Sequence, residues 1–412
     1  MSQDNQIYAA VAVSAGLVAI TFFRPFKNSV TFVVACFYFF FAFGPVINYL
    51  RDEPIYAGIV VERIPQSGLL FTLALAGLAL STALVRQRSS FEMTAMFAST
   101  PQYVMLPIIY MLVTAITVAV ILTSGISLAA LSKRDKIDAV GSEIHYGLLL
   151  VHLIVLSTYL LLPATSAGKR PYFILLGVYA LYCAVTHERD ILFLGITILL
   201  MHSLIHGKIV SLRSVIAGAV SIWTASFLFN WRSGGGYPIL TDVLNEGSLL
   251  FADSRVLYLV PESISHFGGS TYVNAITSLL PGTFYQSNFS TSSWLVEQYG
   301  ASANSGYGFS LEAEAYLNYG YWAVPIVFVL VGSIQRCLVN RIDRHPVFAY
   351  QSVFFTVSLM YSIRNDMLTL LKANVYAAGF FLVLHGMAKL AERHGPKVES
   401  HIGQPRLIGD TE

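Results

Sequence analysis

The stretch from Ser29 to Leu50 reads SVTFVVACFYFFFAFGPVINYL and carries no charged side chain. At a rise of about 1.5 Å per residue, a helix of this length crosses the roughly 30 Å of hydrocarbon in a bilayer. Apolar runs recur along the chain, which predicts an all-α, polytopic integral membrane protein with about 11 transmembrane helices. We expect these helices at residues 7–23, 29–50, 67–85, 103–124, 145–163, 171–186, 191–206, 210–229, 314–335, 347–363 and 368–388.

The overall composition agrees with a membrane protein. Hydrophobic residues make up 55% of the chain and charged residues 12%, whereas about 25% of the residues in a soluble domain are charged. The runs 171–186 and 191–206 are short, so we expect these two helices to be tilted or to stop short of a full crossing. Cys36 and Cys183 fall within predicted helices and Cys337 lies just after one, so neither a disulfide framework nor a cysteine metal site is expected.

The distribution of Lys and Arg predicts the orientation of the chain. Of the 25 such residues, fifteen fall in one of the two alternating sets of loops and ten in the other. The richer set includes residues 336–344 and the C-terminal tail, and cytoplasmic loops carry the Lys/Arg excess. We therefore expect one integral membrane domain, residues 1–390, with a short cytoplasmic tail, 391–412. The N-terminus and a large loop, 231–309, then face outward.

The large loop interrupts the apolar pattern of the chain. It contains thirteen aromatic residues and several glycines, which is too aromatic a composition for a disordered segment. Loops longer than about 15 residues are usually functional when they are ordered. Within it we expect two short interfacial helices, one at 249–260 and one that follows Gly268–Gly269 and ends at Pro281. Such helices either receive lipid-borne substrates or only plug the outer face of the bundle.

Three outward arginines are candidates for binding a phosphate. Arg189 lies in the polar turn Thr186–Asp190, Arg255 lies between apolar stretches of the large loop, and Arg364 precedes Asn365. A planar guanidinium binds phosphate oxygens in a bidentate manner, so arginines that converge on one cavity would form a pyrophosphate clamp. The alternatives are a tight polar turn around Arg189 and, for Arg255, a side chain that snorkels to the membrane surface.

A polar stripe at the end of the large loop supplies candidates for acid–base chemistry. Glu314, Asn318 and Tyr321 are spaced to share one face of a helix that Ser310 is suited to cap. Ionisable groups at membrane depth usually face a cavity and serve function. Glu314 is therefore the first candidate for a general base, and His266 is the reserve. The alternative for Glu314 is an acidic first turn favoured by the helix dipole.

The sequence favours no metal site. His202 and His206 stand one helical turn apart, but no third ligand lies nearby in the sequence, so we expect structural roles for them. Glu188 and Asp190 supply only two carboxylates, fewer ligands than a calcium or magnesium site requires. We therefore expect neither a metal ion nor a cofactor.

Taken in order, these segments resemble a known family. The chain carries an arginine in a short outward turn, 187–190, and then a large loop with Arg255, the segment His266–Tyr272 and the run Leu280–Gly282. It closes with residues 308–320, which read GFSLEAEAYLNYG. That order resembles the Wzy-type O-antigen and oligosaccharide repeat-unit polymerases of bacterial envelopes. One departure is the turn itself, which reads His–Glu–Arg–Asp where a glycine- or serine-flanked arginine is expected.

The resemblance implies an integral-membrane glycosyltransferase of lipopolysaccharide biosynthesis. Such an enzyme joins undecaprenyl-pyrophosphate-linked oligosaccharide repeat units at the periplasmic face of the bacterial inner membrane. Its partners would be that lipid-linked oligosaccharide, membrane lipids and a chain-length regulator, and no nucleic acid. Together with the patterns above, it assigns the pyrophosphate to Arg189, Arg255 and Arg364, the acceptor hydroxyl to Glu314 or His266, and the glycan to Tyr307, Asn318 and Tyr321.

Two related functions remain as alternatives. An O-antigen ligase would differ only in its acceptor. A flippase or transporter of lipid-linked glycans would need internal repeats or ionisable residues at mid-membrane depth, and almost all charges here lie at the ends of the spans. A pyrophosphate leaving group needs charge stabilisation, which fixed arginines supply, so we expect a metal-independent transferase.

Overall fold

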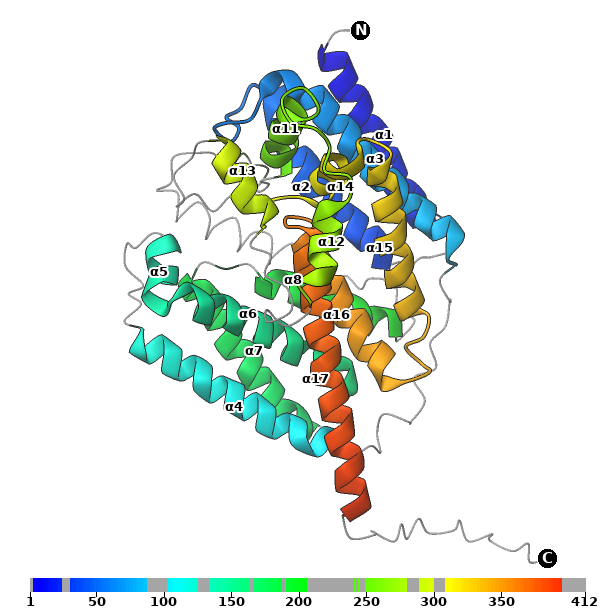
Figure 1. Cartoon of the computed structure of the whole chain (residues 1–412). Helices are drawn as coiled ribbons and strands as arrows, with labels where there is room; N and C mark the ends of the chain where they lie inside the picture. The colour runs from blue at the N-terminus through cyan, green and yellow to red at the C-terminus, as the bar shows by residue number, and fades with distance from the viewer. Residues whose placement is uncertain are drawn as a thin grey trace, which may run out of the picture.

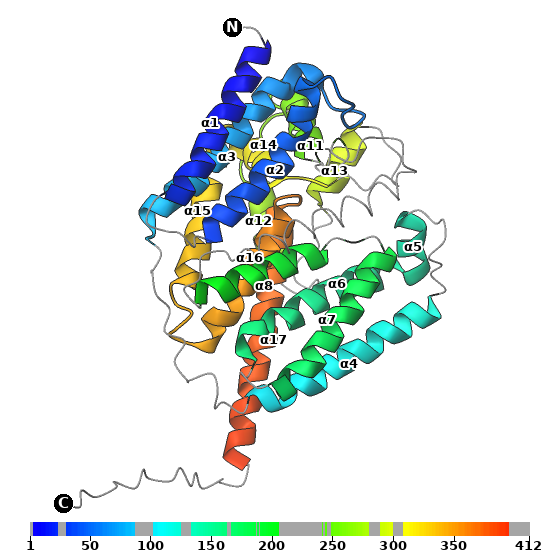
Figure 2. The same cartoon turned by 180° about the vertical axis from the view of Figure 1, so that it is seen from behind.

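The computed structural model describes residues 3–23, 30–86, 102–124, 133–162, 166–186, 188, 190–205, 241, 244, 249–279, 289–299 and 308–394. Across these residues the regular structure is helical (Figure 1 and Figure 2). The predicted all-α fold is confirmed for this part of the chain. By length and composition, five described stretches can cross a membrane: Val30–Leu50, Val61–Leu84, Met105–Thr123, Ser142–Leu161 and Met367–Leu390. The protein is therefore a multi-pass membrane protein.

One group of helices packs around α3. It consists of α1 (Gln3–Phe23), α2 (Val30–Leu50), the 3₁₀ turn η1 (Val61–Arg63), α3 (Ile64–Leu84) and α15 (Ala323–Val339). Helices α3 and α15 approach closely because glycines line their contact. A Cβ on Gly77 would lie 2.6 Å from the carbonyl oxygen of Pro325, and one on Gly332 would lie 2.5 Å from the hydroxyl oxygen of Ser81. Small residues let two membrane helices pack backbone to backbone.

A second group lies in the lower left of Figure 1, with its last helix near the centre of the picture. It contains α4 (Gln102–Thr123), α5 (Lys133–Val140), α6 (Ser142–Leu156) with the 3₁₀ turn η3 (Ser157–Leu161), α7 (Ser166–Thr186) and α8 (Asp190–Ile205). Buried polar groups in this group contact one another: the Tyr110 hydroxyl lies 2.6 Å from the Thr158 hydroxyl, and the His152 ring stacks on Tyr179 with centroids 4.4 Å apart. Such contacts between helices spare polar groups from facing lipid.

Helix α16 (Pro346–Ser362) joins the two groups. Most of its residues are buried, and it packs against α17, α15, α8 and η3. Helix α17 (Met367–His394) then runs down to the C-terminal end, as Figure 1 shows. Its exposed apolar residues, among them Leu382 and Val383, suit contact with lipid.

The described part of the large loop contains short helices. These are α11 (Leu249–Leu259), α12 (Ser270–Thr277) and α13 (Thr291–Tyr299), and α14 (Leu311–Tyr319) follows the loop. Aromatic rings hold the pieces together: Phe267 contacts both Phe289 and Trp294, and Trp294 contacts Phe309, with centroids 5.5–6.5 Å apart. The two short loop helices predicted from the sequence, at 249–260 and after Gly269, are confirmed.

With one exception, the predicted apolar runs coincide with helical segments where the structure describes them, and the run 210–229 lies outside the described residues. One prediction is wrong. The run 314–335 is not one helix, because α14 ends at Tyr319 and α15 begins at Ala323. Gly320 lies between them with φ 75° and ψ −162°. That conformation is open essentially only to glycine, so it ends α14 and redirects the chain.

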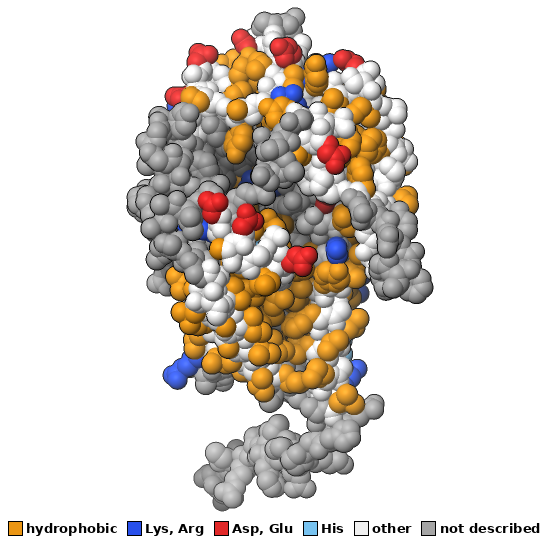
Figure 3. Space-filling view, turned by 60° about the vertical axis from the view of Figure 1, so that its left-hand side comes forward, with side chains coloured by type: hydrophobic (Ala, Val, Ile, Leu, Met, Phe, Trp, Pro, Cys, Tyr) orange, Lys and Arg blue, Asp and Glu red, His pale blue; other side chains and the backbone are white. Residues whose placement is uncertain are grey.

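The two ends of the molecule differ in surface chemistry. In Figure 3, acidic side chains lie in the upper part and around a hollow near the middle, whereas apolar side chains dominate the lower half. The upper part also holds α11, α13 and α14, close to the N-terminus (Figure 1). Carboxylates avoid hydrocarbon, so the surface around these acidic side chains suits water or lipid headgroups, and the apolar surface of the lower half suits contact with lipid.

The orientation of this arrangement can be tested by labelling. Ser263 follows α11, and Arg341 follows α15; both are exposed. In a variant without Cys36, Cys183 and Cys337, we expect Ser263→Cys to react with an impermeant maleimide in intact spheroplasts, and Arg341→Cys to react only after lysis. The opposite result would place the large loop in the cytoplasm.

Candidate functional site

The candidate site is built around α14, whose two ends are closed by side chains and by the loop. At the first end, the Ser310 hydroxyl oxygen accepts a hydrogen bond from the Ala313 N–H at 3.0 Å. This is the predicted N-cap, and it satisfies one of the amide groups that a helix start leaves open. The helix is buried from Leu311 to Asn318, so its polar groups need partners inside the protein.

The other end of α14 is closed by residues 266–269. The N–H groups of Phe267 and Gly268 donate to the carbonyl oxygens of Leu317 and Asn318, each at 3.0 Å. The Gly269 N–H donates to the Asn318 side-chain oxygen at 3.0 Å. Gly268 and Gly269 have φ 59° and 91°, values that favour glycine. The His–Phe–Gly–Gly segment is therefore a cap for α14.

Glu314 joins three helices. Its carboxylate accepts a hydrogen bond from the Thr271 hydroxyl of α12 at 2.7 Å and another from the Met367 N–H, at the start of α17, at 2.6 Å. The Asn318 side-chain amide donates to the Thr271 hydroxyl oxygen at 2.7 Å and to the Glu314 carbonyl oxygen at 2.8 Å. The predicted grouping of Glu314 with Asn318 is confirmed, and Thr271 is a partner that the sequence pattern did not indicate.

The environment of Glu314 favours its protonated form more than water does. Burial, with a smaller contribution from nearby Asp366, raises the pKa of this carboxyl to about 7, against the lowering effect of the Met367 N–H and Thr271 hydrogen bonds. Asp366 itself caps α17, because one carboxylate oxygen accepts from the Thr369 N–H at 2.9 Å. A carboxylate with a pKa near 7 changes protonation state at working pH, as a general base must.

His266 is exposed and has a fixed tautomer. Its Nδ1 lies 3.0 Å from the Tyr316 carbonyl oxygen, and a carbonyl only accepts, so Nδ1 carries the proton. The neutral ring then has its lone pair on Nε2. This nitrogen lies beside Gly320, where an added Cβ would come within 3.7 Å.

Tyr321 does not share the face of Glu314 and Asn318. The break at Gly320 takes it off α14, and its ring packs against Tyr316 with centroids 4.9 Å apart. The predicted three-residue stripe is therefore wrong at its third member. Both phenols lie near Arg63: burial raises their pKa values, and the Arg63 charge lowers them.

Arg63 is a basic residue of this site that the sequence reasoning missed. It forms an ion pair with Glu262 at 2.6 Å, and Glu262 follows α11 nearly two hundred positions later. In the sequence, Arg63 stands just before the predicted helix 67–85. Nothing in its neighbours indicated contact with the large loop.

Arg255 lies on α11 and makes two contacts with other segments. Its Nε donates to the Gly58 carbonyl oxygen at 2.5 Å, and its guanidinium lies over the Tyr299 ring, 4.2 Å from the centroid. A stacked guanidinium keeps its outer N–H groups in one plane, which suits a phosphate.

Arg364 lies in the turn between α16 and α17, over the Phe41 ring at 5.5 Å. Helix α13 connects the turn that carries Arg364 to the region around Arg255. At one end the Thr291 hydroxyl donates to Asp366 at 2.7 Å, and at the other end Tyr299 stacks on Arg255. The helix is nine residues long, so these ends are about 12 Å apart.

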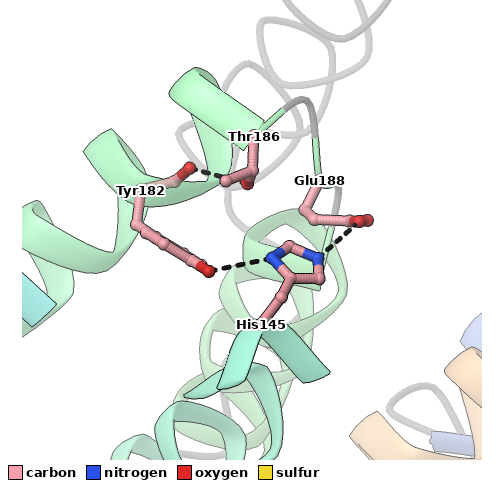
Figure 4. Close-up of polar contacts among 4 residues, drawn as sticks. All are labelled: His145, Tyr182, Thr186 and Glu188. Carbon is pink, nitrogen blue, oxygen red and sulfur yellow. Dashed lines mark hydrogen bonds and ion pairs between the residues drawn. The ribbon is translucent and has the colours of Figure 1, made fainter. Parts of the chain in front are cut away.

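The turn after α7 is fixed by a buried hydrogen-bonded group (Figure 4). His145 lies with its Nδ1 2.8 Å from the Tyr182 hydroxyl and its Nε2 3.0 Å from the Glu188 carboxylate. Glu188 therefore holds the turn against α6 and is already engaged by a histidine. Arg189 lies outside the described residues, as do His206 and Tyr307; His202 lies on α8, but its side chain is not described.

Residues 252–392, about a third of the chain, match the family model of the O-antigen polysaccharide polymerase Wzy. The resemblance to Wzy-type polymerases is confirmed. The matched residues include Arg255, His266, Glu314 and Arg364, together with Asn318 and Tyr321. Neither a curated protein nor a solved structure matches the chain. Within the described residues, no group of three or more His, Cys, Asp and Glu side chains is placed to hold a metal ion.

Proposed function

We propose that this protein is an O-antigen repeat-unit polymerase of the bacterial inner membrane. It joins undecaprenyl-pyrophosphate-linked oligosaccharides at the periplasmic face. The observation that carries this proposal is the Wzy family match over residues 252–392, because that segment contains the described candidates for binding the pyrophosphate and accepting the proton, Arg255, Arg364, Glu314 and His266. A multi-pass helical fold with a polar end fits an enzyme whose substrates are anchored in the same bilayer.

The reaction needs one leaving group and one proton acceptor. The oxygen of an acceptor sugar hydroxyl attacks the anomeric carbon of the donor glycan, and the bond from that carbon to the pyrophosphate oxygen breaks. The electron pair leaves with undecaprenyl pyrophosphate, and the hydroxyl proton passes to a base on the protein. Fixed positive charges stabilise the developing pyrophosphate charge without a proton or a metal ion.

Arg255 and Arg364, with Arg189, are proposed to stabilise the pyrophosphate groups. Arg255 is described in most detail, since its stack on Tyr299 and its bond to Gly58 fix the guanidinium plane. The reaction also brings two lipid-linked glycans together, each with a pyrophosphate. We propose that Arg255 and Arg364, near the two ends of α13, contact pyrophosphate groups on separate carriers.

Glu314 is proposed to accept the proton, with His266 in reserve. A pKa of about 7 lets Glu314 both take up and release a proton near neutral pH. The Glu314 carboxylate is buried and already accepts two hydrogen bonds. A sugar hydroxyl must therefore replace the hydrogen bond from Thr271 in order to reach it. His266 is exposed, and its Nε2 lone pair makes it the alternative acceptor. Asn318, Tyr321 and Tyr307 are proposed to contact the glycan.

The envelope glycan of a strain without this protein tests the function. We expect single repeat units attached to the outer lipid, because units would still be made, exported and ligated. Complementation with the wild-type chain should restore the long polymer. Unattached long polymer would instead mean a ligase, and loss of all outward glycan would mean a flippase.

Replacing Glu314 by Gln tests the base. The amide keeps the shape and can bond to both Thr271 and the Met367 N–H, but it cannot accept the proton. We therefore expect normal binding of the donor glycan and a turnover that is about 10²–10⁴-fold lower. Glu143→Gln is the matched control, since Glu143 is an exposed carboxylate in the first turn of α6. Near-normal turnover of Glu314→Gln would assign Glu314 to helix capping and move the proposal to His266.

Replacing Arg255 by Lys tests the pyrophosphate contact. A lysine keeps the charge but loses the planar fork. Losing a charged hydrogen bond of about 1.5–3 kcal/mol predicts a turnover that is roughly 10- to 100-fold lower on a lipid-pyrophosphate-linked repeat unit. Arg170→Lys, at an exposed position on α7, is the control. Unchanged turnover of Arg255→Lys would contradict the assignment.

A further inference from the structure

The segment between α2 and α3 is bonded to α11 at Arg255. The Gly58 carbonyl oxygen accepts a hydrogen bond from the Arg255 Nε at 2.5 Å. Two residues later, the Val60 N–H donates to the hydroxyl oxygen of Ser254 at 3.2 Å, and Ser254 is fully buried. Two adjacent residues of α11 are therefore held by a segment that precedes them by nearly two hundred positions. That segment lies outside the residues that match the Wzy family model.

Gly58 can make this contact because it has no side chain. Its φ is 90°, a left-handed value that favours glycine. An added Cβ would lie 2.7 Å from the Tyr299 hydroxyl oxygen and 3.0 Å from the Phe251 ring, which is closer than nonbonded atoms pack. A side chain at this position would therefore displace Tyr299 from Arg255 or move the Gly58 carbonyl group away from it.

Two aromatic rings limit the movement of the Arg255 guanidinium. Its carbon lies 4.2 Å from the Tyr299 ring centroid and 5.9 Å from that of Phe251. The two rings meet edge to face with centroids 5.5 Å apart, and Phe251 is fully buried. Because a cation is attracted to the face of an aromatic ring, Tyr299 holds one face of the guanidinium while Gly58 holds its Nε edge.

The contact with Gly58 determines which edge of Arg255 can bind a ligand. A guanidinium presents one pair of N–H groups from Nε and a terminal nitrogen, and a second pair from its two terminal nitrogens. Among the described residues, the Nε–H donates to Gly58, so the first pair is occupied. Arg255 is only partly buried. The pair on the two terminal nitrogens is therefore the one that a phosphate can reach.

We propose that Gly58 and Tyr299 are positioning residues of the donor site, which direct the two terminal nitrogens of Arg255 end-on to one phosphate of a polyprenyl pyrophosphate. The identity of this ligand rests on the proposed function. The proposal assigns the segment between α2 and α3 to the donor site. Both residues act through Arg255 and not through contact with the substrate.

Binding of farnesyl pyrophosphate, a short polyprenyl pyrophosphate, tests the proposal without the transfer reaction. It is measured by calorimetric titration of the purified full-length protein in detergent. Tyr299→Leu removes the aromatic face, and we expect binding that is about 3- to 30-fold weaker. Tyr299→Phe keeps the face and should recover most of that loss. Gly58→Ala should weaken binding about 10-fold, because it disturbs the hydrogen bond to the charged Nε.

The same changes in an Arg255→Met background separate positioning from a general effect on the fold. Methionine keeps an unbranched side chain but leaves no cation to orient. Tyr299→Leu and Gly58→Ala should therefore add little to the loss that Arg255→Met causes alone. The matched controls are Tyr258→Leu, at an exposed position of α11, and Gly16→Ala, where a Cβ meets no atom within 4 Å. Both should bind as the wild type does, and farnesol, which lacks the pyrophosphate, should not distinguish the variants.

Equal losses from Tyr299→Leu with and without Arg255 would overturn the positioning role, as would a wild type that does not bind farnesyl pyrophosphate. If Gly58→Ala does not fold, the comparison of Tyr299→Leu with Tyr299→Phe decides. The proposed function fails in a different way. The glycan pattern of a ligase or a flippase in the deletion strain, together with the expected dependence on Arg255, would overturn only the proposed function.

Discussion

The ends of buried helices need hydrogen-bond partners away from water, and this requirement binds the large loop to the transmembrane helices. Ser310 caps the first turn of α14. The last carbonyl oxygens of this helix accept hydrogen bonds from the N–H groups of residues 267 and 268. The first N–H of α17 donates a hydrogen bond to the Glu314 carboxylate. Because an unsatisfied buried amide costs on the order of 1–3 kcal/mol, moving any one of these elements away exposes the ends of the others.

The sequence predicts the helices well, since apolar runs and capping residues are local signals. The runs around α2, α16 and α17 and the cap at Ser310 are examples. It predicts the break at Gly320 poorly, because glycine is common in membrane helices and its φ becomes unusual only when the next helix is fixed elsewhere. The run 210–229, with Arg189 and Tyr307, remains a prediction outside the described residues.

In the candidate site, too, local features follow from the sequence, whereas contacts between distant segments do not. The spacing of Glu314 and Asn318 is a helical signal, and the structure confirms their contact. The contacts of Glu314 with Thr271 and Met367, about fifty positions away on either side, follow from packing that no local pattern encodes. Glu312 reads in the sequence as one more acidic residue in a first turn. Both Glu312 and Glu314 are buried in the structure, and Glu314 has hydrogen-bond donors on both oxygens.

Helix α13 has a mechanical consequence for the end of the molecule that carries the candidate site. One end is bonded through Thr291 to the turn before α17, and the other lies under Arg255 through Tyr299. A helix is far stiffer along its axis than a side chain or a loop, since every turn is closed by backbone hydrogen bonds. The separation of the two arginine-bearing regions is therefore set by a rod of fixed length, and a substrate that binds both adjusts to the protein rather than the reverse.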